Sequence, residues 1–335
     1  VMYREKTKEG EIYGGPMYVI KNGLPKRMLP LAYFFALAGM IGCLPAFQSN
    51  QLIQITGDIA FSEIENFNIF GGLALAGITG IVVIGGLKRI AEVATFLVPL
   101  MGSIYFGAML IALILNLDQV FPAFKLILVD AFNGTAIAGG TFFGVLIYGV
   151  RRGAFSNEAG MGTESLVHGV AKVSDPVKQG LVAMTGPIFD TLIICTATAL
   201  MILISGVWET SASQGVTLTA EAFSMLLGNF GAFILFICVI CFGLSTIFTY
   251  SYYGASCSRF LFGKFGMNFY TYLYIFSIFI YSIVPIDIAI NIADGAFAMM
   301  AIPTLVSALW LAPKVMQASK NYFKLIDNHQ KNEIL

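Results

Sequence analysis

The chain has 335 residues, of which 57% are hydrophobic and only 11% are charged. Soluble globular chains carry roughly 25% charged residues, so this composition excludes a soluble protein of this length, and the abundance of Phe and Tyr excludes intrinsic disorder. Basic and acidic residues balance at 19 each, which excludes a nucleic-acid partner recognised through overall basic charge. The sequence therefore predicts a protein embedded in a lipid bilayer.

A helix needs about 20 mostly apolar residues to cross the hydrocarbon core of a bilayer, and eight stretches of the chain qualify. These stretches are too long and too uniform for barrel strands, so the predicted fold class is an all-α polytopic membrane protein. The predicted spans cover roughly residues 31–55, 69–87, 94–115, 136–150, 180–206, 224–249, 268–286 and 290–312.

The basic residues predict the orientation of these spans. Every Lys and Arg except Lys125 lies before the first span or after an even-numbered one. Because basic residues concentrate in cytoplasmic loops, we expect a multi-pass protein of the plasma (inner) membrane with both ends of this chain in the cytoplasm. The predicted cytoplasmic parts are residues 1–30, 151–178 and 314–335. Residues 118–133, on the opposite side, have apolar positions at helical spacing and predict a helix lying on the membrane surface.

The first span ends in a polar run, AFQSNQLIQ. Polar groups within a span are costly and face protein or water. One interpretation has Gln48 lining a central cavity together with Phe47. The other places the whole polar run at the outer interface, beside water.

The fourth span is short for a full crossing and carries glycines at positions 139, 140, 144 and 149. Glycines at this density allow helices to pack closely. They also allow a helix to break and to expose backbone groups to a ligand, as in many secondary transporters. The short length of the span favours the break.

Asp190 is a lone carboxylate within the fifth span. Arg151 and Arg152 are the nearest basic residues by sidedness, so one interpretation is a structural ion pair or a helix-end interaction. The other is a gating or proton-handling role.

The sixth span ends in FGLSTIFTYSYYG, where Ser245 and Thr246 offer adjacent hydroxyl groups. Such hydroxyls commonly bond the carbonyl four residues back. Together with carbonyls of a broken helix, they would instead form an uncharged oxygen site suited to a monovalent cation. Tyr250 lies one turn beyond Thr246 on the same face, where it could bound a small ligand.

No motif typical of an enzyme is present in the given sequence: it lacks GxSxG, HExxH and a P-loop, and His168 and His329 lie far apart outside the spans. We therefore expect a protein that is not an enzyme and that uses no cofactor.

Five further stretches of the chain stand out as motifs: GGPMYVIKNGL (14–24), FQSN (47–50), RRGAFSNEAGMG (151–162), QGL with FDT (179–191) and STIFTYSYYG (245–254). Together they resemble the motifs of the alanine/glycine:cation symporters. The resemblance covers the whole chain in order. It implies a LeuT-type inverted-repeat fold, of which this chain holds the last eight of about eleven helices, and hence a truncated N-terminus. Residues 1–335 would form a single transporter domain, with the rest of the first repeat and the start of a broken helix in 31–150 and the rest of the second repeat in 179–313.

The resemblance also implies a function and a site. The family takes up alanine or glycine with Na⁺, or in some members H⁺, by alternating access. The implied sodium site holds Ser245 and Thr246. Residues implied in substrate binding are Phe47, Gln48, Phe143, Gly144, Ile147 and Tyr250, and residues implied in gating or structure are Arg151, Asn157, Glu158 and Asp190. Alternatives are a channel or receptor-like subunit that does not transport, or an inert fragment of a transporter.

Overall fold

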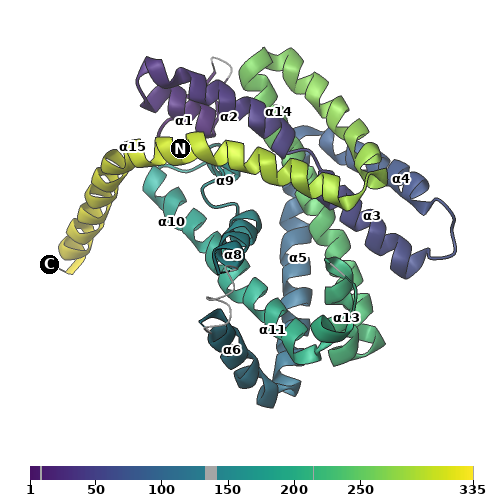
Figure 1. Ribbon diagram of the computed structural model, residues 1–335. Helices are drawn as coiled ribbons and strands as arrows, with labels where there is room; N and C mark the ends of the chain where they lie inside the picture. The colour runs from purple at the N-terminus through teal and green to yellow at the C-terminus, as the bar shows by residue number, and fades with distance from the viewer. Residues whose placement is uncertain (8–9, 133–141, 214, 335) are drawn as a thin grey trace.

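The computed structural model describes residues 1–7, 10–132, 142–213 and 215–334, which are almost entirely helical (Figure 1). The first part comprises a short antiparallel hairpin of β1 (Glu5–Lys6) and β2 (Ile12–Tyr13), then α1 (Pro16–Gly23), a 3-10 turn (Lys26–Met28), α2 (Leu29–Gly42), α3 (Ala46–Ala60), α4 (Phe67–Val83), α5 (Gly86–Leu115) and α6 (Leu117–Ala131). The second part comprises α8 (Phe142–Asn157), α9 (Thr163–His168), α10 (Pro176–Pro187), the π-helical segment η2 (Ile188–Cys195), α11 (Thr196–Ser205), α12 (Val207–Thr210), α13 (Val216–Leu227), α14 (Asn229–Ile283) and α15 (Ile286–Ile334).

Five helical segments within the described residues are long and apolar enough to cross a membrane: Lys26–Ala60, Gly86–Leu115, Pro176–Ser205, Phe230–Ile283 and Ile286–Asn328. The shorter helices α4 and α13 are also apolar. Large apolar side chains lie on the outside of the molecule, among them Phe121 and Phe265, which are 77% and 81% exposed. The prediction of an all-α, multi-pass membrane protein is confirmed.

The first predicted span is divided. Residues 31–55 do not form one helix, because α2 ends at Gly42 and α3 begins at Ala46, directly after Pro45. A proline has no backbone N–H and is best tolerated at the start of a helix, so Pro45 suits the point at which α3 begins. The predicted helix within 118–133 is confirmed as α6.

The longest helix, α14, reverses its direction at Gly263. This residue has φ 67° and ψ −155°, a conformation that glycine alone adopts without strain. The two limbs then run antiparallel and are joined by hydrogen bonds: the Ser258 hydroxyl donates to the Gly266 carbonyl at 2.9 Å, and the Tyr274 hydroxyl donates to the Ile247 carbonyl at 2.7 Å. One 55-residue helical element thus supplies two antiparallel limbs.

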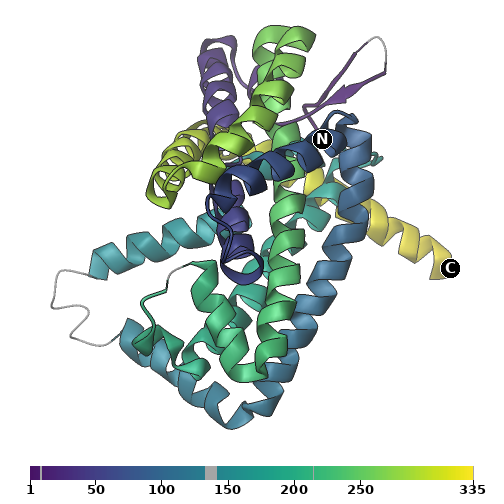
Figure 2. The same cartoon turned by 90° about the vertical axis from the view of Figure 1, so that its right-hand side faces the viewer.

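The helices pack around two main clusters of buried side chains. In the larger one, α14 packs against α2, α3 and α4, and α15 packs against α2 and α3, with Phe35, Tyr250 and Phe297 in the interior. In the second, Tyr105 of α5 and Phe223 of α13 stack with ring centroids 5.5 Å apart, beside α11 and the first limb of α14. Figure 2 shows α5 (blue) beside this limb (green) over the lower half of the molecule. The first limb of α14 therefore connects the two clusters.

Candidate functional site

A helix break separates α8 from α9. Residues 158–162 leave the helical conformation, and three of them have positive φ: Glu158 at 54°, Gly160 at 80° and Gly162 at 93°. Positive φ is uncommon for a residue with a side chain, and such strain gathers at functional sites. The break therefore marks a candidate site.

This break lies beyond the stretch 136–150 in which the sequence predicted one. We expected the helix to break among the glycines of 136–150, but α8 runs unbroken through Gly144 and Gly149; Gly139 and Gly140 lie outside the described residues. Residues 151–157 continue α8, so a loop does not begin at residue 151 as predicted. Glycine in a helix costs only about 1 kcal/mol relative to alanine, so Gly144 and Gly149 do not by themselves break α8.

The backbone of the break is held by side chains from both of its ends. The Ala159 N–H donates to Asn157 Oδ1 at 2.9 Å, and the Ser165 hydroxyl donates to the Gly162 carbonyl at 2.7 Å. Since a helix interruption leaves backbone groups without their helical partners, these contacts replace part of the lost bonding. The sequence SNEAG (156–160) thus contains both the start of the break and Asn157, one of the side chains that bond its backbone.

Two long helices hold the break from outside. From α14, the buried Tyr250 donates a hydrogen bond from its hydroxyl to the Glu158 carboxylate. From α15, the Thr304 hydroxyl lies 3.3 Å from the carbonyl of Met161. Gly162 lies so close to its neighbours that an added Cβ would approach Pro16 Cγ to 2.6 Å and Thr304 Oγ1 to 2.7 Å. The break is a closely packed junction between α1, α14 and α15.

A chain of aromatic side chains lies beside the break. Phe155 of α8 makes edge contacts with Phe47 of α3 at 5.7 Å and with Phe297 of α15 at 5.5 Å between ring centroids. Tyr250 continues the chain, 6.4 Å from Phe297. The structure thus brings Phe47 and Tyr250, two of the proposed substrate residues, to one cluster. Sequence reasoning missed Phe155 and Phe297, because single aromatic residues in apolar helices carry no distinctive signal.

The other proposed substrate residues lie elsewhere. Phe143 and Ile147 are 70% and 57% exposed on α8, and Gly144 is exposed with them. At 1.5 Å per residue, Ile147 lies about 16 Å along the helix from Glu158. Figure 2 shows α8, at the left, reaching away from the other helices. Gln48 is half-buried on α3, next to Phe47.

The proposed sodium ligands lie on the first limb of α14. The hydroxyls of Ser245 and Thr246 both donate to the carbonyl of Phe242, at 3.0 and 2.9 Å. This is the back-bonding that we considered as the alternative to an ion site. Each hydroxyl oxygen keeps lone pairs that can still face a cation. Ser245 is buried and Thr246 half-buried.

The two arginines of α8 bind Asp294 of α15, not Asp190. Arg152 forms a direct ion pair with the Asp294 carboxylate, and Arg151 Nη1 lies 3.8 Å from the same oxygen. The Arg152 guanidinium also lies 5.5 Å above the rings of Tyr148 and Phe155. The predicted pairing of Asp190 with Arg151 or Arg152 is therefore wrong. Asp294 received no role from the sequence, because its position near the start of the last predicted span also fitted an interfacial residue.

Asp190 has hydroxyl neighbours instead. Its Oδ2 accepts a hydrogen bond from Ser156 Oγ at 2.6 Å and from Thr191 Oγ1 at 3.1 Å. Asn157 Nδ2 in turn donates to Thr191 Oγ1 at 3.1 Å. Asp190 and Thr191 belong to the π-helical segment η2, and Ser156 and Asn157 end α8. These four residues form a polar cluster beside the break.

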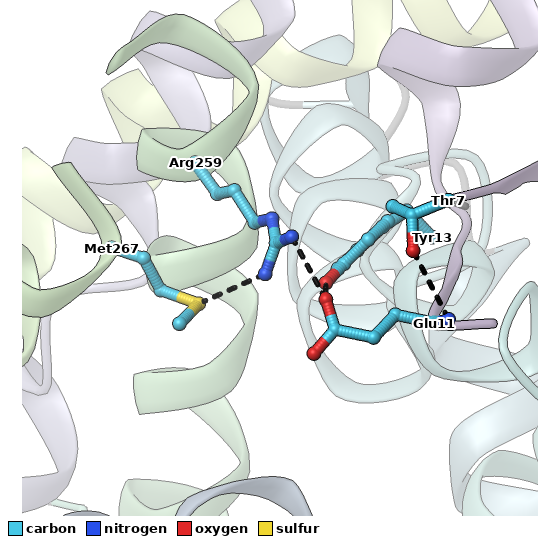
Figure 3. Close-up of polar contacts among 5 residues, drawn as sticks. All are labelled: Thr7, Glu11, Tyr13, Arg259 and Met267. Carbon is cyan, nitrogen blue, oxygen red and sulfur yellow. Dashed lines mark hydrogen bonds and ion pairs between the residues drawn. The ribbon is translucent and has the colours of Figure 1, made fainter. Parts of the chain in front are cut away.

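A contact far along the chain from the break joins the N-terminal hairpin to α14 (Figure 3). Arg259 Nη2 lies 3.0 Å from Glu11 Oε2, and its guanidinium lies 3.7 Å above the ring of Tyr13, whose hydroxyl donates to the same carboxylate. The hydrogen bond from Tyr13 and then the Arg259 guanidinium lower the pKa of Glu11. Burial, and then the hydrogen bond to Glu11, raise the pKa of Tyr13. Sequence reasoning assigned these residues no role.

A cavity of about 670 Å³ lies among α1, α9, α10 and α15. Its lining is mostly apolar, with Pro16, Gln179 and Leu311 among its residues. Thr304 lines this cavity and also contacts the carbonyl of Met161 in the break. The cavity therefore adjoins the break on the side that Thr304 occupies.

Comparison with known proteins gives a consistent result. Residues 1–334 match the model of the sodium:alanine symporter family. The chain is 36% identical over 334 residues to an uncharacterized transporter, YflA, of Bacillus subtilis (strain 168), covering 96% of this chain and 69% of that protein. It is 34% identical to the sodium/alanine symporter AgcS of Methanococcus maripaludis (99% and 74% covered) and 32% identical to a probable sodium/glutamine symporter, GlnT, of Bacillus subtilis (96% and 66%).

Proposed function

Because the chain belongs to the sodium:alanine symporter family, we propose that it imports a small neutral amino acid, alanine or glycine, together with Na⁺. The protein is a multi-pass membrane transporter and not an enzyme. We further propose that the protein has a LeuT-type fold of inverted repeats and transports by alternating access. We also propose that it lies in the plasma membrane with both ends of this chain in the cytoplasm.

The helix break at residues 158–162 is the observation that carries this proposal. Transporters bind amino acids where interrupted helices present unpaired backbone groups to the substrate's ammonium and carboxylate. Here the break lies beside Phe47, Phe155 and Tyr250, which can enclose a small aliphatic side chain. Phe143, Gly144 and Ile147 lie farther along α8, and their contact with the substrate stays part of the proposal.

The coupling ion is proposed to bind at Ser245 and Thr246. Two uncharged hydroxyl oxygens suit a monovalent cation, because they provide ligands without an excess of negative charge. The site lies one to two turns before Tyr250 on α14. An ion at this site and a substrate at the break would both favour the arrangement in which α14 is closed against α8. Because both ligands favour the same arrangement, the binding of one would strengthen the binding of the other.

Radiolabelled alanine uptake into proteoliposomes tests this function. We expect uptake that depends on an inward Na⁺ gradient and that the double variant Ser245→Ala/Thr246→Ala abolishes. Thr271→Ala is the matched control, because Thr271 makes the same type of back-bond, to the Met267 carbonyl at 3.0 Å, on the other limb of α14. Uptake driven by a proton gradient alone would discard sodium as the coupling ion. No uptake of any small neutral amino acid would overturn the symporter proposal.

The relative named as a sodium/glutamine symporter makes glutamine the second candidate substrate. Competition of unlabelled glycine and glutamine against labelled alanine distinguishes these substrates. A channel, by contrast, would equilibrate the amino acid but could not accumulate it above its external concentration.

A further inference from the structure

A groove on the outside of the molecule takes no part in the proposed transport site. Its volume is about 650 Å³, and it lies between α4 and the second limb of α14. Gly77, Gly80 and Ile84 of the α4 side line one wall, and Ile275 of α14 contributes to the other. No residue of the helix break lines this groove, so it is separate from the site where the amino acid is proposed to bind.

The glycines of α4 leave this groove unfilled. At Gly72 the two helices pack closely, because an added Cβ would approach Ser282 Cβ to 2.8 Å. At Gly80 the nearest atom to an added Cβ is Ile275 Cδ1 at 3.7 Å, and at Gly77 an added Cβ meets no atom of the described chain within 4 Å. Since glycine has no side chain, the surface stays hollow along Gly77 and Gly80.

The rim of the groove has the character of a lipid-facing surface. Ile81 and Ile84 line the groove and are 63% and 61% exposed. The second limb of α14 belongs to a segment that is long and apolar enough to cross a membrane, and α4 is apolar as well. Large apolar side chains that stay exposed on such helices suit hydrocarbon and not water. The groove therefore opens toward the acyl chains of the bilayer.

One end of the groove carries a positive charge. Arg89 lines the groove where α4 passes into α5, and its aliphatic stem lies against Gly85, where an added Cβ would be 2.4 Å from Arg89 Cδ. Among the described residues, no ion pair includes Arg89, and Glu92 lies 4.0 Å from Lys88 instead. A guanidinium binds phosphate oxygens in a bidentate manner, so Arg89 complements an anionic headgroup above an apolar groove.

The side of the membrane fits such a headgroup. Lys88 and Arg89 are among the basic residues for which we propose a cytoplasmic position, and Lys264 follows the reversal at Gly263 where the second limb of α14 begins. The cytoplasmic leaflet carries anionic lipids, which attract basic residues near its surface. The charged end of the groove would then lie at the level of these headgroups.

We propose that this groove binds one anionic phospholipid, with an acyl chain along Gly77 and Gly80 and the phosphate at Arg89. The inference goes beyond the proposed symport function and depends on neither the substrate nor the coupling ion. The bound lipid fills the hollow between α4 and the second limb of α14. Because it binds the folded protein, it stabilises this helix pair against unfolding.

Native mass spectrometry of the purified protein, titrated with phosphatidylglycerol or with phosphatidylcholine, tests the headgroup. We expect one phosphatidylglycerol to be retained in preference to phosphatidylcholine, and Arg89→Gln to weaken its apparent affinity about tenfold. Lys88→Gln removes the same charge from the neighbouring position, whose side chain is 91% exposed, and should change this affinity little. Equal weakening by both variants would assign the effect to general attraction and overturn the proposal, as would equal retention of both lipids.

A second variant tests the hollow and leaves Arg89 in place. Gly77→Leu puts a side chain into the groove from a position where an added Cβ meets no described atom, so the protein should fold and lose the bound phosphatidylglycerol. Gly107→Leu on α5, where an added Cβ also meets no described atom within 4 Å, is the matched control and should retain the lipid. Unchanged retention in a folded Gly77→Leu protein would overturn the proposal.

Thermal unfolding in detergent gives an independent measurement that requires no transport. A ligand of the folded state raises the unfolding temperature as its concentration increases. We expect added phosphatidylglycerol to stabilise wild type and Gly107→Leu more than Gly77→Leu or Arg89→Gln. If Gly77→Leu instead converts a dimer into a monomer without changing lipid retention, the groove binds a second copy of the chain and the lipid proposal fails. A protein that shows the lipid effects but transports no amino acid would refute the symport proposal alone.

Discussion

The hydroxyl of Tyr250 donates a hydrogen bond to the carboxylate of Glu158, and this bond joins the buried face of α14 to the one non-glycine residue of the break that has positive φ. A residue in this conformation costs of order 1–3 kcal/mol and persists only where its surroundings hold it. Tyr250 is buried and packs against Phe297, so it cannot easily follow if Glu158 relaxes. The pair therefore holds the backbone at the site where the substrate is proposed to bind.

Removal of this hydrogen bond should weaken substrate binding. Tyr250→Phe keeps the ring contacts and deletes only the hydroxyl. Hydrogen bonds to charged groups contribute about 1.5–3 kcal/mol, so the alanine KM should rise by one to two orders of magnitude while the protein stays folded. Tyr272→Phe, at a tyrosine that is 64% exposed on the other limb of α14, is the control. Equal KM values for wild type and Tyr250→Phe would contradict this role.

The closely packed glycine of the break should not tolerate a methyl group. Gly162→Ala would combine positive φ with contacts of 2.6–2.9 Å to Pro16, Thr304 and Phe35, which we expect to cost about 2–4 kcal/mol. Thermal unfolding and alanine uptake measure the loss. Gly153→Ala in α8, where an added Cβ meets no atom within 4 Å, should retain both properties. A fully active and stable Gly162→Ala protein would show that the break can rearrange to accommodate a methyl group.

The ion pair between α8 and α15 should contribute to stability. Asp294→Asn leaves Arg152 without its partner, and because the Arg152 side chain is 32% exposed we expect a loss of about 2 kcal/mol, less than for a fully buried pair. Asp287→Asn, at an exposed position of the same helix, serves as the control. Thermal unfolding of both variants gives the comparison. Partial rescue by the charge exchange Arg152→Asp/Asp294→Arg would attribute the loss to the pair itself.

Docking of the N-terminal hairpin should depend on pH. The pKa of Glu11 is lowered by Tyr13 and Arg259, so the contact stabilises docking above the pKa of a free Glu, about 4.3, and this stabilisation is lost as the pH falls through the lowered value. The protection of the amides of residues 11–13 against hydrogen exchange, measured relative to the intrinsic exchange rate at each pH, should therefore fall in strongly acidic buffer and stay high near neutrality. In Glu11→Gln this acid-dependent loss of protection should be absent; its persistence would assign it to another group.

The sequence was enough to predict the class of fold, because this class depends on the apolar character summed over many residues of each helix. The helical, membrane-embedded character and the helix at 117–131 follow from such sums, and both are confirmed. The shared location of Phe47 and Tyr250 agrees with the motif-based expectation, although their role in binding stays a prediction.

The position of the helix break and the partner of Arg152 depend on single residues or residue pairs, so the apolar pattern could not predict them. The break begins at Glu158, whose side chain gives no local signal for positive φ, whereas Gly144 and Gly149, two of the glycines that suggested a break, lie in a continuous helix. Similarly, Arg152 has several acidic residues within plausible reach. Only the packing of α8 against α15 selects Asp294 over Asp190.

The reversal of α14 at Gly263 has a consequence for how the chain reaches the membrane. The contacts that join its limbs, from Ser258 to Gly266 and from Ile247 to Tyr274, connect residues only 8 and 27 positions apart. Contacts this local form early, since little chain entropy is lost in making them. The two limbs can therefore leave the translocation machinery as one preassembled hairpin, which the remaining helices then join.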